Sequence, residues 1–489
     1  MYAPDAWGII VSIRSSSAIG SVALSLIFAA GAVLGSSAPV TAAPVSTAAT
    51  TAVTEAATAR PNVLNIVLDD MRDQSPAQIA AYMPKTVKWL SSGTFFSNAD
   101  VSTPSCCPAR AAGMTGQYDH NNGMMHQHDI PSFDPTTTVP NFLQQGGYQT
   151  ALVGKYLHEW PLTTAPPDYD YYAMWQSAGY QNPRVNVMGK TAKVTGYATT
   201  LAGDYAMQYL QKMAADPAGR PWYEYVAIHA PHPQGTGTYI PETKYASAPV
   251  PACGVKQPGE LDLTDKPPYA KWVKVTDATV QTTCQGQMRV LMSVDDQIDR
   301  LMTYLQSSGQ LANTMVVFWS DNGTLWGEHN RISKFLPYSN AINIPMWLRW
   351  DGHVATGTST DLVSNVDIAP TIYQATGTGP GSSVVLDGHS LLSPVNRSVE
   401  FNEYWYDTAN GNVPTWAELH DTHFAYIETY NSDTGALAFQ EYYNLDNDPA
   451  EATNLLKDAS KTNDPAKSLV TSLHNQVTAY RTCAGSTCP

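Results

Sequence analysis

Four short apolar runs, each followed directly by polar residues, constrain the fold of this chain more than any other feature. The runs are NVLNIVL (62–68), YQTALV (148–153), WYEYVAI (222–228) and TMVVFW (314–319). Runs that are apolar throughout are typical of strands buried on both faces, as in parallel sheets. Helical patterns lie between them, the clearest at 290–309, where apolar residues recur every three or four positions. The sequence therefore predicts an α/β domain with a large, mainly parallel sheet between layers of helices.

The C-terminal part of the chain has a different pattern. Two strand-like runs, HFAYIETY (423–430) and ALAFQEYYNL (436–445), are joined by the turn sequence NSDTG, which indicates an antiparallel hairpin. Asp464 and Pro465 predict the start of a terminal helix that continues to Tyr480, because aspartate caps helices and proline suits the first turn. This part is predicted to form a small antiparallel α+β subdomain.

The N-terminal residues differ in composition from the rest. An apolar run at 18–35 follows Arg14 and precedes small residues, which predicts a secretory signal peptide over 1–42 and an exported protein. An uncleaved membrane anchor is the alternative, because the run is nearly long enough to span a bilayer. Residues 43–60 have the composition of a low-complexity linker. The predicted order after the linker is an α/β catalytic domain over 61–395 and the antiparallel subdomain over 396–489.

Charge and cysteine content restrict the partners of the chain. The 489 residues carry a formal net charge of −15, which argues against nucleic acid as the main partner, because binding to phosphate backbones requires clustered Lys and Arg. Any anion site must therefore be local. Export permits disulfides, and the chain has six cysteines. The plausible pairs are Cys253 with Cys284 and Cys483 with Cys488.

The polar residues that follow the apolar runs are expected to share one site, because ligands of open α/β sheets bind at the carboxyl ends of the strands. Adjacent acids after a buried strand are costly unless something neutralises them. Carboxylate and amide oxygens suit calcium or magnesium. The alternative for each motif alone is an ordinary turn at a strand end. The residues selected in this way are Asp69, Asp70, Lys155, His158, His232, Asp321 and Asn322.

The segment TPSCCPARAAGMTGQ places two adjacent cysteines at the start of a short predicted helix. Pro108 suits the first turn and Gly116 is a typical end, so Cys106 and Cys107 fall at the positive N-terminus of the helix. This position stabilises a thiolate or another developing anion. Taken alone, such a pair is more often structural than catalytic.

Several motifs, taken in order, resemble the sulfatase family. Cys106, Pro108 and Arg110 match its C-x-P-x-R signature, and Thr115 with Gly116 matches the continuation. The resemblance covers nearly everything after residue 60. "SCCPAR" and "GKYLHEW" are most similar to the branch that contains glucosamine-6-sulfatases and extracellular heparan sulfatases. The other matching segments are RPNVLNIVLDD, APHP, SDNGTLWGEH, VSNVDIAPTIYQATG, DGHSLL and YYNLDNDPAEATNLL.

This resemblance implies an alkaline phosphatase-like fold and a specific chemistry. A formylglycine-generating enzyme would oxidise Cys106 to formylglycine (3-oxoalanine), and Cys107 would be only its neighbour. The hydrated aldehyde would attack the sulfur of a sulfate ester beside a divalent cation. One calcium ion per chain would be bound by Asp69, Asp70, Asp321 and Asn322 together with the modified Cys106.

The resemblance also implies roles for the remaining site residues. His232, in APHP, would protonate the leaving oxygen as general acid, and His158 is the candidate base for the release of sulfate. Arg110 and Lys155 would hold the hydroxyls of the formylglycine hydrate and the sulfate. The side chains expected to contact the substrate are Lys155, His232, His329 and Lys334.

Other histidines have simpler interpretations. His120, His126 and His128 cluster after the signature helix, and we interpret them as the rim of a substrate pocket or as a surface loop rather than a transition-metal site, because they lack a regular ligand spacing. His229 is interpreted as a hydrogen-bonded histidine at a strand end.

The sequence thus predicts a secreted, calcium-dependent sulfatase that releases inorganic sulfate from an aryl sulfate or a sulfated carbohydrate. A phosphodiesterase or phosphonate hydrolase that uses the same site is one alternative. A non-catalytic binder of sulfated glycans is another, if Cys106 remains a thiol.

Overall fold

A computed structural model of the chain describes residues 60–489, except 177–178, 236, 255–261, 272–274 and 409–412. The predicted signal peptide over 1–42 and the predicted linker, apart from its last residue, lie outside the described residues. Among the residues that are described, no helix combines the length and apolar character needed to cross a bilayer.

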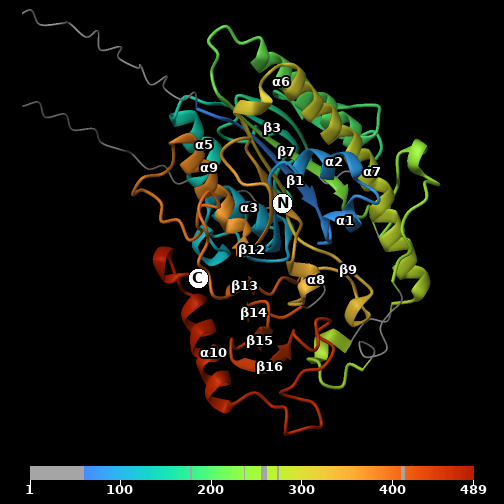
Figure 1. Ribbon diagram of the computed structural model, residues 1–489, viewed down its shortest axis with the longest axis vertical. Coiled ribbons are helices and arrows are strands. Elements are labelled where there is room, and N and C mark those ends of the chain that lie inside the picture. Colours follow the sequence, from blue (N-terminus) through green and yellow to red (C-terminus); the bar gives the residue numbers. More distant parts are fainter. Residues whose placement is uncertain (1–59, 177–178, 236, 255–261, 272–274, 409–412) are drawn as a thin grey trace, which may run out of the picture. The chain divides into compact units, whose positions relative to one another are not determined.

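A ten-stranded sheet forms the centre of the fold (Figure 1). From one edge to the other, its strands are β12 (Gly357–Ser364), β2 (Thr94–Asp100), β11 (Met346–Arg349), β8 (Thr314–Ser320), β1 (Asn62–Asp69), β7 (Trp222–Pro231), β3 (Gln149–Lys155), β4 (Tyr171–Trp175), β5 (Arg184–Val187) and β6 (Lys190–Lys193).

The four predicted apolar runs form the neighbouring central strands β8, β1, β7 and β3. These strands pair in parallel with one another, as do β3 with β4 and β12 with β2. By contrast, β11, β5 and β6 pair with their neighbours in antiparallel fashion. The prediction of a mainly parallel sheet is confirmed, and the continuous apolar runs are explained because every residue of β1, β7 and β8 is buried.

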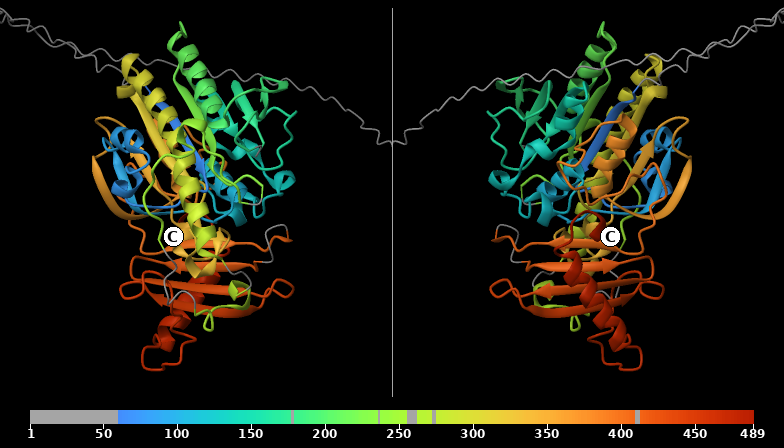
Figure 2. Two further views of the ribbon diagram at one scale, coloured as in Figure 1. Left: turned by 90° about the vertical axis from the view of Figure 1, so that its right-hand side faces the viewer. Right: turned by 90° about the vertical axis from the view of Figure 1, so that its left-hand side faces the viewer.

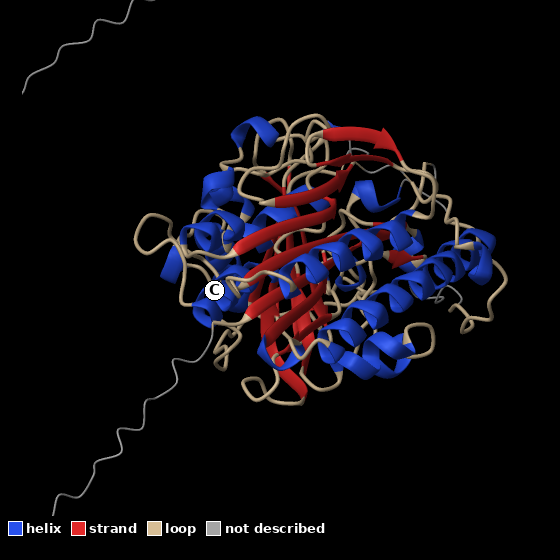
Figure 3. Cartoon of the chain, turned by 90° about the horizontal axis from the view of Figure 1, so that it is seen from above, coloured by secondary structure: helices blue, strands red, loops and turns tan. Residues whose placement is uncertain are grey.

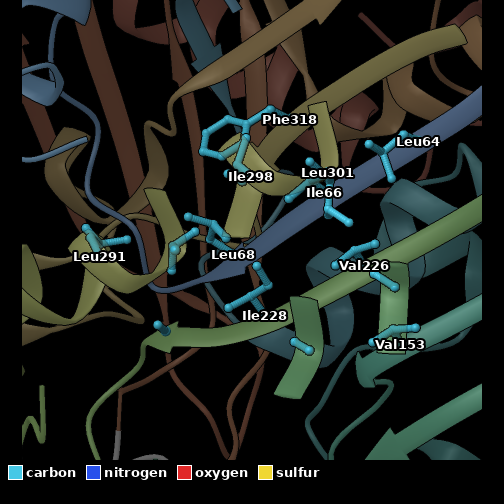
Figure 4. Packing of buried hydrophobic residues seen from close by; sticks show 14 of the residues in the cluster. Leu64, Ile66, Leu68, Val153, Val226, Ile228, Leu291, Ile298, Leu301 and Phe318 are labelled. Atoms are coloured by element: carbon cyan, nitrogen blue, oxygen red, sulfur yellow. The ribbon is translucent and has the colours of Figure 1, made fainter. Parts of the chain in front are cut away.

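Helices cover both faces of this sheet (Figure 3). Alternate side chains of β1 enter two separate cores: Leu64, Ile66 and Leu68 enter one, and Val63 and Val67 enter the other. Figure 4 shows the first core, where β1, β7 and β8 pack against a long helix. The helices are α1 (Pro76–Ile79), α2 (Pro84–Leu90), α6 (Ala198–Ala214) and α7 (Asp277–Ser307) on the first face, α3 (Cys106–Thr115), α5 (Val139–Gln145) and α9 (Ile368–Thr376) on the second, and the short α4 (Asp119–Asn122) and α8 (Ser339–Ile342).

The long helix α7 contains the helical pattern found in the sequence. Its predicted part is confirmed, but the helix begins at Asp277, well before 290. The side chain of Thr276 caps it by accepting the N–H of Thr279. The first turns are rich in Thr and Gln, so the apolar period there is weak. Cys284 in this part forms the predicted disulfide with Cys253.

A four-stranded antiparallel sheet follows the large one (Figure 2). The predicted hairpin is confirmed as its last two strands. The terminal helix α10 (Lys467–Tyr480) starts later than expected, because Ala466 is its N-cap and Asp464 instead lies 3.9 Å from Lys461. The second predicted disulfide, Cys483–Cys488, follows α10. The strands are β13 (Glu400–Tyr404), β14 (Trp416–His420), β15 (Phe424–Tyr430) and β16 (Leu437–Asn444), and a separate two-stranded pair consists of β9 (Leu325–Trp326) and β10 (Ile332–Ser333).

The end of β3 permits a sharp stability test. Gly154 has φ +103°, and a Cβ atom there would lie 2.0 Å from the carbonyl oxygen of Ala227 in β7. We expect Gly154→Ala to lower the free energy of unfolding by about 3 kcal/mol or more, because overpacking and a left-handed backbone each cost about 1–3 kcal/mol. Gly352→Ala is the control, since Gly352 has φ +80° and no neighbour within 4 Å. If urea denaturation shows the same loss of unfolding free energy in both variants, the contact with β7 has no effect on stability.

Candidate active site

The signature helix α3 begins at Cys106, the first of the two adjacent cysteines. Gly116 ends it in the left-handed conformation, and its N–H donates to the carbonyl of Ala112, as the sequence predicts. Both cysteines are buried, and neither forms a disulfide. Burial, assisted by Asp69, raises the pKa of Cys106 far above its usual range. Burial therefore opposes the stabilisation of a thiolate that is expected at a helix N-terminus.

Four oxygen-bearing residues from two strand ends form a buried cluster, which we call the acid cluster: Asp69, Asp70, Asp321 and Asn322. Asp69 ends β1, and Asp70 follows with a left-handed backbone (φ +72°). The N–H of Asp70 donates to Asp321 Oδ1 (3.1 Å), and Asn322 Nδ2 donates to Asp70 Oδ1 (2.8 Å). The expectation that polar residues after parallel strands share one site thus correctly brought together residues that are more than 250 positions apart.

Two buried cations neutralise one side of the acid cluster. Lys155, at the end of β3, donates to Asp69 Oδ2 at 2.5 Å. Arg110, on α3, donates through Nε to Asp321 Oδ2 at 2.7 Å and through Nη1 to the carbonyl of Lys155 at 2.9 Å. The remaining nitrogen, Arg110 Nη2, has no hydrogen-bond partner among the described residues and lies 3.6 Å from Asp69 Oδ2. A buried donor of this kind fits an acceptor bound in the site.

A third cation, Lys334, connects the acid cluster to Cys106. Its Nζ atom donates to Asp70 Oδ1, to Asn322 Oδ1 at 3.1 Å and to Cys106 Sγ at 2.7 Å. Cys106 Sγ also lies 3.4 Å from Asp69 Oδ1. The thiol is therefore directed at the acid cluster, where the predicted nucleophile is required.

The charges of this site nearly cancel. Burial alone would raise the pKa values of Asp69 and Asp70, but Lys155 and Lys334 respectively, together with His232, hold them below the usual range. Burial and the neighbouring Asp69 raise the pKa of Asp321. Three carboxylates face three buried cations, so a divalent cation in the acid cluster would leave the site positive. This explains how an acidic chain could hold an anion locally.

Two histidines, one among the last residues of β7 and one directly after the strand, lie close to Asp69 and Asp70. His232 Nδ1 must be the donor to the carbonyl of Pro233 (2.7 Å), so in the neutral ring Nε2 carries no proton and lies 3.8 Å from Asp70 Oδ2. Burial lowers the pKa of His232 to about 4. His229 Nδ1 is 3.6 Å from Asp69 Oδ2, longer than a hydrogen bond, and neither ring nitrogen has a partner among the described residues. The predicted position of His229 at a strand end is confirmed, and its ring lies beside Asp69 in the site.

The second cysteine, Cys107, forms hydrogen bonds that attach two loops to the start of α3. Cys107 Sγ accepts the backbone N–H of His158 at 2.8 Å, and the N–H of Cys107 donates to Gln127 Oε1 at 3.2 Å. Gln127 in turn donates to Ser105 Oγ at 3.0 Å. Burial raises the pKa of Cys107 to about 12. Sequence reasoning missed Gln127, because a buried glutamine in a loop has no distinguishing pattern.

The other histidines considered in the sequence, His329 and the three after α3, have contacts outside the acid cluster. His329 stacks on Tyr338 with ring centroids 3.8 Å apart, and no described contact joins it to the acid cluster, so its role at the sulfate remains a prediction. The three histidines after α3 pair with three different acids. His120 pairs with Glu403, His126 with Asp129 and His128 with Glu159, at 2.7, 2.7 and 2.8 Å.

The sequence was compared with family models and known proteins. Residues 61–378 match the family model described as Sulfatase. The chain belongs to the sulfatase family. Residues 327–482 also match the model described as N-sulphoglucosamine sulphohydrolase, C-terminal. This second match begins before residue 396, and the predicted domain boundary remains a prediction.

Several sulfatases of other organisms are similar over most of the chain. The N-acetylglucosamine-6-sulfatase of Homo sapiens is 27% identical over 88% of this chain and 86% of its own length. The N-acetylglucosamine-6-O-sulfatase of Bacteroides thetaiotaomicron is 24% identical over 81% of this chain and 83% of its own length. A Sulf-1 homolog of Caenorhabditis elegans is 27% identical over 76% of this chain, but the chain spans only 55% of that protein.

Solved structures confirm the predicted fold class. A protein solved in complex with its substrate D-glucosamine-2-N,6-O-disulfate superposes with a TM-score of 0.69 at 22% identity, covering 86% of this chain and 96% of that one. A phosphonate monoester hydrolase of Silicibacter pomeroyi superposes with a TM-score of 0.68 at 19% identity, covering 85% and 95%. At these identities the likeness concerns the fold alone.

The residues present fit the groups that sulfatases use. The acid cluster consists of carboxylate and amide oxygens, the donor set that calcium prefers. One ligand atom each of Asp69, Asp70, Cys106 and His232 lie within 4.8 Å of one another. The unpartnered Arg110 Nη2 and the ammonium of Lys334 suit oxygens at position 106 better than a thiol, because sulfur is a weak acceptor.

Proposed function

We propose that this sulfatase-family protein hydrolyses the sulfate ester of a sulfated carbohydrate or an aryl sulfate and releases inorganic sulfate. The observation that carries the proposal is the buried contact of Cys106, at the start of α3, with Lys334 and the acid cluster. The names of the similar proteins, which are sulfatases, also support it.

The chain's own residues would hold both groups that the reaction needs. Asp69, Asp70, Asp321 and Asn322 would bind one calcium ion, together with residue 106 as formylglycine. When present, the hydrated aldehyde supplies the nucleophile and the cation supplies charge neutralisation.

The buried cations would orient the substrate. Lys155 and Arg110 are fixed by their ion pairs with Asp69 and Asp321, so they lose little entropy when a sulfate enters. Lys334 reaches both Asp70 and residue 106, which places its charge beside the group that reacts. Burial makes each of these charges more effective than it would be in water.

His232 would supply the proton to the leaving oxygen. Its neutral ring holds the one proton on Nδ1, which donates to Pro233, so Nε2 must first take up a second proton. The negative sulfate ester raises the pKa of a neighbouring imidazole and favours this uptake. His158, whose loop is attached to Cys107, remains our candidate base for the release of sulfate.

The proposal includes secretion and maturation. The apolar run at 18–35 and the two disulfides support export, because disulfides form in oxidising compartments. Oxidation of Cys106 by a formylglycine-generating enzyme would precede activity. Mass spectrometry of the peptide with Cys106 from natively produced protein should show formylglycine, whereas an unmodified cysteine would favour a binder of sulfated glycans.

Substrate comparison tests the reaction class. We expect turnover of an aryl sulfate to exceed turnover of an aryl phosphodiester, and glucosamine 6-sulfate is the first carbohydrate to test because of the relatives' names. The formylglycine content of the sample is measured in parallel as the control. A clear preference for the phosphodiester would contradict the proposal and favour a phosphodiesterase or phosphonate hydrolase.

A further inference from the structure

A second group of metal-binding side chains lies beside the active site and outside the acid cluster. One ligand atom each of His128, His158 and Glu159 lie within 4.8 Å of one another. His128 Nδ1 is 2.8 Å from Glu159 Oε2, and the two histidine rings have centroids 5.9 Å apart. The group thus consists of two imidazoles and one carboxylate with ligand atoms no more than 4.8 Å apart.

The two loops that carry these side chains are fixed to the same place. His128 follows Gln127, whose side chain accepts the N–H of Cys107. His158 and Glu159 follow β3, and the N–H of His158 donates to Cys107 Sγ. Both loops are therefore attached to the start of α3, although they are about 30 residues apart in the sequence. This attachment preorganises the pair of histidines, which lowers the entropy cost of binding a shared ion.

We propose that His128, His158 and Glu159 form a binding site for a transition-metal dication, for which Zn²⁺ is the best match. Two imidazoles, one carboxylate and a water molecule make up a common tetrahedral zinc shell, with ligand distances of about 2.0–2.2 Å. Ligand atoms in such a shell are about 3.3–3.6 Å apart, so the wider pairs would have to approach by about 1.5 Å at most. His128 Nδ1 and Glu159 Oε2, now 2.8 Å apart, would have to separate slightly. His128 and Glu159 have side chains that are 37% and 54% exposed, so they are free to make this adjustment.

The chemistry of the ligands separates this site from the calcium site. Calcium prefers oxygen ligands and binds imidazole poorly, whereas zinc and copper favour imidazole. Excess calcium should therefore saturate the acid cluster and leave the histidines available. The inference has a consequence that depends on the proposed function: a metal ion on His158 would occupy the imidazole of the candidate base and inhibit turnover.

Equilibrium dialysis of Zn²⁺ against the full chain with excess Ca²⁺ tests the site without reference to activity. We expect one Zn²⁺ bound per chain, and His128→Ala or Glu159→Gln should weaken the binding by on the order of 100-fold, because each removes a direct ligand. His126→Ala is the matched control, since His126 lies in the same loop and pairs with Asp129 instead. Its Zn²⁺ affinity should equal that of the wild type.

The inference has two parts, the Zn²⁺ site and the inhibition of turnover through His158, and a different result would contradict each. Absence of Zn²⁺ binding, or binding that is equal in the wild type and the His128→Ala variant, would overturn the site whatever the activity. Turnover of an aryl sulfate, measured in the same samples, should fall with Zn²⁺ occupancy in the wild type and not in His128→Ala. If turnover is unchanged at full Zn²⁺ occupancy, His158 does not act in the catalytic step, but the metal site itself is still supported.

Discussion

Cys106→Ala should lose sulfate-ester hydrolysis by on the order of 10⁴-fold or more, because removing a nucleophile eliminates the reaction path that the rest of the site supports. The thiol of Cys106 is the one that contacts Lys334 Nζ and approaches Asp69. A methyl group at this position cannot be oxidised to an aldehyde. Loss of activity should therefore occur in a folded protein, which the thermal midpoint will verify.

Cys107→Ala is the matched control, since it removes the same atom from the adjacent, equally buried residue. Its sulfur accepts the backbone N–H of His158, and leaving that N–H without a partner costs about 1–3 kcal/mol. We expect a modest decrease in turnover and in the thermal midpoint, because the loop with His158 loses its attachment. Comparable loss of activity from both substitutions would mean that the nucleophile is misassigned.

The layers of the fold could be predicted because burial leaves a direct trace in the sequence. Strands buried on both faces consist mostly of apolar residues, so β1, β3, β7 and β8 were visible as runs. The first and last residues of the helices were harder to predict. α7 begins in a segment rich in Thr and Gln, and α10 is capped by the backbone of Ala466 rather than by Asp464. In both cases the local residues allow several starts, and tertiary packing selects one.

Some residues of the candidate site could also be predicted from the sequence, and others could not. Residues that directly follow a central strand, such as Asp69, Lys155 and Asp321, could be grouped from topology alone, because parallel strands end at one edge of the sheet. Lys334 comes from the loop after β10, between Ser333 and Phe335, which both have left-handed backbones. No periodicity indicates such a conformation, so Lys334 was identified only through the resemblance to sulfatases.

Asp321→Asn should weaken calcium binding by at least about 100-fold, because even the loss of an outer-shell partner costs about 10–100-fold in metal affinity. The substitution keeps the shape of the side chain and an oxygen for Arg110 Nε, which now donates to Oδ2 at 2.7 Å. Because an amide has only one oxygen, the N–H of Asp70, which now donates to Oδ1, loses its acceptor. The substitution also removes one of the three negative charges that face the cations, so the ion loses Coulomb attraction in a buried site.

The control for this substitution is Asp73→Asn, which neutralises an acid close to Asp70 in the sequence but outside the acid cluster. Burial raises the pKa of Asp73 to about 6, so Asp73 keeps most of its charge at pH 7 and the substitution removes that charge. Calorimetric titration with Ca²⁺ should show wild-type affinity for Asp73→Asn and greatly reduced affinity for Asp321→Asn, with turnover restored in the latter at high Ca²⁺. Equal affinities in the two variants would contradict a cation bound by Asp321, and the buried cations Arg110, Lys155 and Lys334 would then have to account for anion binding alone.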